Sequence, residues 1–124
     1  VMLILVVEPE KLPEAREITG SLQEMQEIVG GMIQVLYPFP GEEIALVCND
    51  EGKLLGLELN RGLRDGIGNL YDIICGTFFL CGAPADSDEF SGLTPQQMKR
   101  MEQRFHTPEI FVGMGGRIIC LPME

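Results

Sequence analysis

Apolar residues in this chain gather in short runs that are separated by turn residues, a pattern typical of β-strands. The runs cover residues 2–7, 32–37, 44–48, 71–75, 77–81, 110–114 and 117–121. We predict a strand at each of them. Residues 15–19 predict a short strand that pairs back onto 2–7, and residues 54–59 predict a return strand after a hairpin turn at 49–52.

Two stretches carry helical signals instead. Ser21 is a good N-cap with Glu24 three residues later, apolar residues follow at helical spacing, and Gly30-Gly31 can end the helix, so we predict a helix over 22–29. Thr94, Pro95 and Gln97 form the same kind of start for a second helix, which ends near His106.

Strands outnumber helices and most are joined by hairpins, because only two helices are available for parallel crossovers. We therefore predict an α+β fold, in which a largely antiparallel and strongly bent sheet is packed by two short helices. A half-closed barrel remains an alternative. The length of 124 residues is that of one ordinary domain, so residues 1–124 are expected to form a single domain.

The charge of the chain narrows the classes of partner. Nine basic and nineteen acidic residues give a net charge of −10, which disfavours direct nucleic-acid binding. The acidity serves either solubility alone or a negative surface that docks on a basic partner. No apolar run reaches the roughly 20 residues of a membrane helix, and residues 1–9 are too short and lack the basic flank of a signal peptide. We expect no membrane contact and a cytoplasmic location.

The four cysteines all lie within apolar runs. They form no Cys-x-x-Cys pair, and one histidine is too few to complete a zinc site, so we expect reduced, mostly buried thiols and neither metal nor cofactor. His106 is expected to act as a cation at a helix end, because no motif sets a nucleophile or carboxylate beside it. An enzyme is therefore the least favoured class.

The sharpest local signal is the polar, glycine-rich stretch at 60–68, which we predict to be a loop between two strands. Arg61 and Arg64 are suited to a bidentate grip on phosphate or carboxylate. The alternative is a surface loop in which both arginines pair with neighbouring carboxylates. The predicted ligand-binding residues, none of them catalytic, are Asn49, Asn60, Arg61, Arg64, Gly76 and Thr77.

These segments resemble a known family. The runs CNDEGKLLGLELNRGLRD and YDIICGTFFLCG, the stretch EFSGLTPQQ and PEIF near the end are similar to the domain of unknown function numbered 3846, carried by phages and mobile elements of Gram-positive bacteria. The likeness extends to the opening LVVEP and to SLQEMQEIVGG. It implies a small phage or mobile-element protein, some of whose relatives accompany antirestriction-like proteins, and it supplies no reaction.

Two functional hypotheses follow. In the first, the protein is a non-enzymatic binder in the host cell that sequesters a small anionic, nucleotide-like ligand in counter-defence. In the second, it is an acidic adaptor or inhibitor that engages a host defence protein. A homodimer or larger assembly is expected in both cases, because long apolar strands in a domain of this size are hard to cover.

Overall fold

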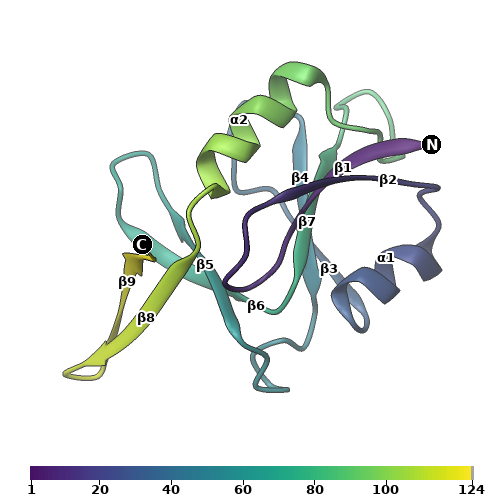
Figure 1. Cartoon of the computed structure of the whole chain (residues 1–124). Coiled ribbons are helices and arrows are strands. Elements are labelled where there is room, and N and C mark those ends of the chain that lie inside the picture. Colours follow the sequence, from purple (N-terminus) through teal and green to yellow (C-terminus); the bar gives the residue numbers. More distant parts are fainter. Residues whose placement is uncertain (124) are drawn as a thin grey trace.

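The central feature of the computed structural model, which describes residues 1–123, is a five-stranded antiparallel sheet with the strand order β2–β1–β7–β4–β3 (Figure 1). Its strands are β1 (Met2–Val7), β2 (Glu14–Ile18), β3 (Ile33–Leu36), β4 (Ile44–Asn49) and β7 (Phe78–Gly82). The predicted pairing of the second strand with the first is confirmed, with Met2 opposite Ile18.

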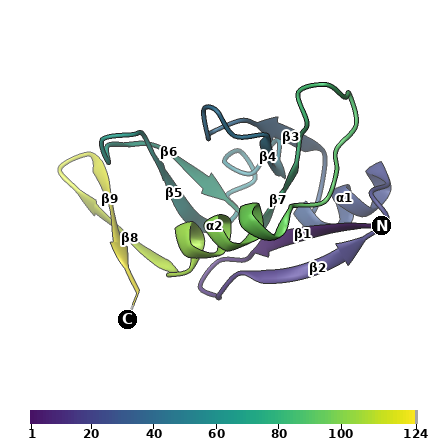
Figure 2. The same ribbon diagram turned by 90° about the horizontal axis from the view of Figure 1, so that it is seen from above.

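The two helices cover opposite faces of this sheet (Figures 1 and 2). Helix α2 (Pro95–Phe105) packs on the face that carries Leu5, Leu46 and Leu80, whereas α1 (Leu22–Val29) packs on the face that carries Val6, Val47 and Phe79. Because β4 and β7 are buried on both sides, their sequences are apolar without alternation. The continuous runs seen in the sequence are thus explained.

Both helices begin and end close to where their capping residues predict. The Ser21 hydroxyl accepts from the Glu24 amide at 3.1 Å, and Gly30 takes a left-handed φ of 81° at the end of α1. Thr94 and Gln97 form a full capping box at the start of α2. Neither helix of the described chain has the length and apolar character needed to cross a bilayer.

A second sheet consists only of β5 (Leu59–Arg64) and β6 (Leu70–Cys75). Two predictions were wrong here. Residues 60–64 form a strand rather than part of a loop, and residues 54–59 do not return along β4, which pairs with β3 and β7 instead. The turn after β4 leads the chain out of the first sheet and into the second.

The third sheet is the predicted hairpin of β8 (Glu109–Met114) and β9 (Arg117–Pro122), which extends away from the body of the protein (Figures 1 and 2). The fold is therefore α+β with mostly antiparallel sheets and two helices, as predicted. The expectation of one strongly bent sheet or half-closed barrel was wrong, because in the described residues the strands divide among three separate sheets that do not curl into a barrel.

Candidate functional site

Arg61 lies in the core, with 1% of its surface exposed, although its sequence context predicted a surface loop. Its guanidinium donates to backbone carbonyls from distant parts of the chain: Nε and Nη2 to Phe105 O at 3.2 and 3.1 Å, and Nη2 to Lys11 O at 2.7 Å. Burial lowers the pKa of this guanidinium, and the charge of Glu109 opposes that effect. Arg61 thus joins β5, the β1–β2 connection and the end of α2.

Asn60 completes this polar cluster and is fully buried. Its Nδ2 donates to Val7 O at 2.8 Å and to Gly76 O at 2.9 Å, while its Oδ1 accepts from Arg61 Nη1 at 2.9 Å. The side chain therefore connects the second sheet to the ends of β1 and β6. Every polar side-chain group of Asn60 and Arg61 has a partner within the chain, which is the satisfied state expected of buried polar groups.

Arg64, the second predicted anion ligand, does not join Arg61. Its Nη2 lies 2.9 Å from Glu109 Oε2, and the hydrogen bond to Glu109 raises the pKa of Arg64. The Gly62 amide donates to the other oxygen of Glu109 at 2.9 Å. Arg64, Arg104 and Glu109 line an open cleft of about 400 Å³ that also contains Asp65. The two positive charges there face two negative ones, so the cleft attracts anions weakly.

The other predicted site residues are spread over the fold. Asn49 is buried and donates through Nδ2 to Val29 O at 3.1 Å, so it connects β4 to the end of α1. Gly76 has a left-handed φ of 82°, and a Cβ added there would lie 2.7 Å from Leu57 Cδ1. Thr77 follows it and is half-buried. Among the six predicted site residues, the hydrogen bonds that the structure describes join Asn60 to Arg61 and to Gly76.

The cysteines are all free, as predicted, and three of the four are buried. Burial raises the pKa of the Cys48 thiol to about 11 and that of Cys81 to about 12. Cys48 and Cys75 line a cavity of about 200 Å³ beside the Lys53–Asp72 ion pair. A raised pKa keeps these thiols protonated at neutral pH, which makes them poor nucleophiles and poor metal ligands. Residues 1–123 contain no group of three side chains placed to hold a metal ion.

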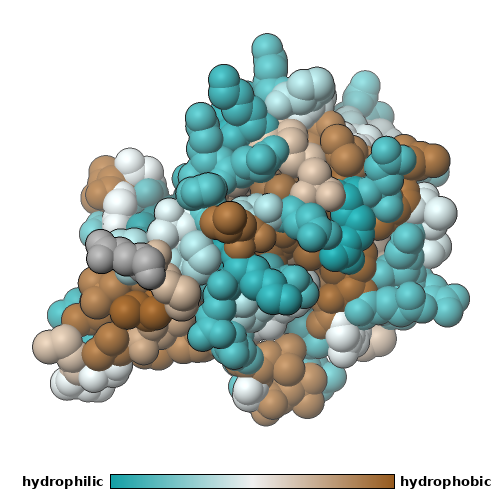
Figure 3. All heavy atoms as spheres, viewed as in Figure 1, coloured by the Kyte–Doolittle hydropathy of each residue, from teal (hydrophilic) through white to brown (hydrophobic). Residues whose placement is uncertain are grey.

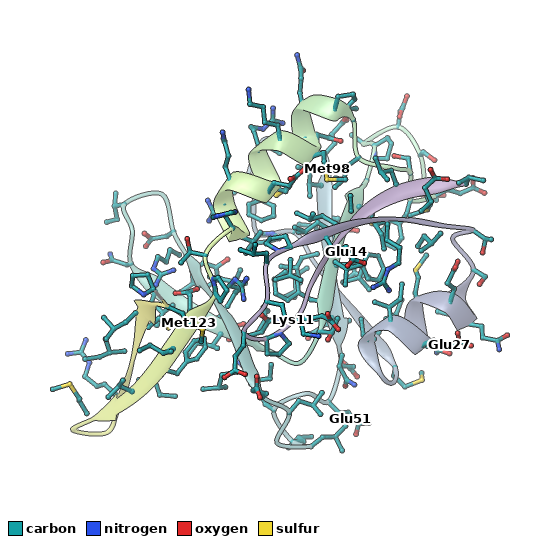
Figure 4. All side chains as sticks on the ribbon, viewed as in Figure 1. Lys11, Glu14, Glu27, Glu51, Met98 and Met123 are labelled. Atoms are coloured by element: carbon teal, nitrogen blue, oxygen red, sulfur yellow. The ribbon has the colours of Figure 1, made fainter. Side chains whose placement is uncertain are left out.

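Acidic side chains outnumber basic ones by nineteen to nine. Five ion pairs involve Lys11, Arg16, Lys53, Arg64 and Arg100, and each takes up one carboxylate. Arg61 is buried among carbonyls and neutralises no carboxylate by direct contact. Most of the nineteen acidic side chains therefore lack a basic partner within the described chain. Exposed examples are Asp86, Asp88 and Glu89 in the β7–α2 loop, Glu27 on α1, and Glu51 after β4 (Figure 4).

The hairpin of residues 109–122, called the arm below, has the opposite character. Figure 3 shows apolar side chains gathered on it, at the lower left of that view. One face of the arm turns toward β5, where Phe111 and Cys120 are half-buried, while Ile118 on this inner face remains 48% exposed nearer the tip. The other, the outer face, carries five apolar side chains that remain 39–59% exposed: Ile110, Val112, Met114, Ile119 and Leu121.

The two strands of the arm were predicted from the sequence, but the exposed apolar face that they form was not. A sequence signal was present, since residues 110–114 and 117–121 are apolar at both alternating sets of positions, although a two-stranded sheet at the surface can bury only one set. Glu109 was also missed as the residue that anchors the arm to β5. Its partners lie 45 and 47 residues earlier in the chain.

These features define the class of protein: a small acidic α+β domain with a satisfied polar core, an accessible acidic surface and an apolar arm. The chain belongs to the family described as a domain of unknown function, DUF3846, whose model matches residues 2–106. The arm lies after the matched part. Neither the curated proteins nor the solved structures include a match to this chain.

Proposed function

We propose that this protein is a non-enzymatic adaptor or inhibitor that acts by placing its acidic body against a basic surface of another protein. The observation that supports this most directly is the large set of carboxylates left without basic partners after five ion pairs have formed. Such a surface steers association with a positively charged protein and repels nucleic acid.

The acidic surface has a rigid support, which favours a docking role over solubility alone. The loop with Asp86, Asp88 and Glu89 is held at both ends, because Ser91 and Gly82 exchange backbone hydrogen bonds at 2.8 and 2.9 Å. The Ala85 amide also donates to Glu43 Oε1 at 3.0 Å. Fixed charges lose less conformational freedom on binding than charges on a floppy segment, so they contribute more to affinity.

The small-anion hypothesis has less support from the geometry. Arg61 is fully engaged within the fold, and Arg64 is paired with Glu109, so a phosphate would have to compete with a carboxylate already in place. The cleft shared by Arg64 and Arg104 is where such a ligand would bind. A thermal-shift screen with nucleotides and cyclic nucleotides tests this second candidate, and Arg104→Gln should remove any shift that depends on the cleft.

The family resemblance suggests where and in what process this protein acts. A phage or mobile-element origin, a location in the host cytoplasm and a role in counter-defence are part of the proposal. Under it, the basic partner is a protein of the host defence. The experiment must therefore identify a partner and locate its contact at the same time.

Two variants with equal net charge provide that test. One replaces the loop carboxylates, as Asp86→Asn, Asp88→Asn and Glu89→Gln, and the other replaces Glu17, Glu27 and Glu51, which are exposed and likewise outside the five ion pairs, by Gln. Proteins captured from a Gram-positive host extract by the wild type are identified, purified and titrated against each variant at several NaCl concentrations. We expect a basic partner, weaker binding at higher salt, and a larger loss of affinity for one triple variant than for the other. Salt-independent binding, or no loss with either variant, would refute it.

A further inference from the structure

We propose that the arm is a self-association surface, on which a second copy of this chain packs its own arm with the two outer faces together. This inference goes beyond the adaptor function, since it concerns a different surface of the protein. It places two acidic bodies in one assembly, held together by two hairpins.

The register of the arm places its apolar side chains on one continuous face. Ile110 lies opposite Leu121 and Val112 opposite Ile119, so these four side chains form two adjacent cross-strand pairs on the same side of the ribbon. Met114 extends the row toward the tip, where Arg117 is its partner. Arg117 is the only charged residue on the outer face, and it stands at the end rather than in the middle.

The outer face is as apolar as the buried face of a sheet, but no part of the described chain packs over it. A two-stranded ribbon is marginally stable in water and gains stability when an apolar face packs against another layer. The anchor of the arm, in which Glu109 binds the Gly62 amide and Arg64, holds only its base and its inner face. A second layer on the outer face would remove this apolar surface from water, which is the dominant favourable term in most protein–protein association.

The distribution of charge favours a second copy of this chain as the partner of the outer face. Each chain carries a net charge of −10, so two copies repel one another over most of their surface. The arm contains one acid, Glu109, and one base, Arg117, and is therefore neutral as a unit. It is the part through which two copies can meet with least repulsion. A basic partner, in contrast, is drawn to the carboxylates of the body.

Symmetry and size agree with this choice. Two identical ribbons related by a two-fold axis present the same apolar face to each other, and stacked sheets pack about 10 Å apart. Each six-residue strand spans about 20 Å, so one outer face buries less than the roughly 800 Å² per partner of a standard stable interface. The expected dimer is therefore weak and forms in the micromolar range or above.

Sedimentation velocity over a concentration series tests the inference with the full chain. The test variant is Ile119→Lys on the outer face, and the matched control is Ile118→Lys, the same change on the neighbouring residue of the inner face. We expect the wild type and Ile118→Lys to shift from monomer to dimer as concentration rises. Ile119→Lys should raise the dissociation constant about thirtyfold or more. Circular dichroism confirms that both variants remain folded.

Salt separates this inference from the proposed function. Raising NaCl screens the repulsion between two acidic bodies and should strengthen the dimer, whereas it should weaken the contact with a basic protein. A wild type that stays monomeric at every concentration and salt level would overturn the inference and leave the adaptor function standing. Equal loss of the dimer in both variants, or no loss in Ile119→Lys, would overturn the placement on the outer face.

Discussion

Replacing Arg61 should cost more stability than any other single change of a charged side chain in this protein. The guanidinium makes five hydrogen bonds to Phe105, Lys11 and Asn60, four of them at 2.7–3.2 Å. Arg61→Met keeps most of the aliphatic stem and removes the charge and all the donors. The acceptors would then be left in the core without partners.

The magnitude follows from those acceptors. A buried polar group that loses its partner costs about 1–3 kcal/mol. Four acceptor atoms lose a donor at once, although Lys11 O is only partly buried. Removing the buried charge gives back part of its desolvation penalty, which is several kcal/mol for one ion. We therefore expect Arg61→Met to lower the free energy of unfolding by about 3–4 kcal/mol. This is a large part of the 5–15 kcal/mol that stabilises a typical domain.

Chemical denaturation followed by circular dichroism measures this loss, and Arg64→Met is the matched control. Arg64 is an arginine on the same strand whose pair with Glu109 is partly exposed, so its loss should cost at most about 1 kcal/mol. If Arg61→Met stays within 1 kcal/mol of the wild type, or is the milder of the two, the structural role of Arg61 is refuted. An anion-binding role would then regain its support.

Three further expectations concern the glycines and thiols. Gly76→Ala should lower the free energy of unfolding by about 2 kcal/mol, because the new Cβ meets Leu57 and the φ is left-handed. Gly56→Ala should cost only about 1 kcal/mol, because its φ of 69° is left-handed but the space around it is open. Urea denaturation midpoints of the two variants measure the difference. Cys48 and Cys81 should resist alkylation by iodoacetamide at pH 8 until urea is added, since burial raises the pKa of both thiols; rapid labelling of the native protein would contradict this. As pH rises above about 9, the unfolded chain loses these thiol protons before the folded protein does, so the free energy of unfolding should fall. The fall continues to about pH 11 for Cys48 and about pH 12 for Cys81, and urea denaturation at pH 7 and pH 10 measures it.

The elements predicted correctly are those whose signals are local. Both helices are defined by caps within a few residues, and the arm by a Gly-Gly turn between two apolar runs. The strand at 59–64 was missed because its glycine and arginines resemble a surface loop, and their burial depends on groups far away in sequence. Arg61 finds its acceptors 44 and 50 residues away. No spacing within the chain reveals such partners.

The surroundings of the predicted site residues depend on distant partners in the same way. Arginine side chains that look available for a ligand in the sequence are equally suited to carbonyl groups at the end of a helix, where the helix dipole favours a cation. The choice between these uses depends on where α2 ends relative to β5, which is a property of the whole fold. The division into three sheets has the same origin, since strand pairing beyond hairpins is set by packing.

The buried guanidinium also links the base of the arm to the core electrostatically. Arg61 has no carboxylate in direct contact, and the charge of Glu109 opposes the lowering of its pKa by burial. Glu109 therefore has two roles, because it accepts hydrogen bonds from Gly62 and Arg64 and its charge favours the cation that joins β5 to α2. A variant without this carboxylate would lose more than the anchor of the arm, because the guanidinium would be held less favourably in the core.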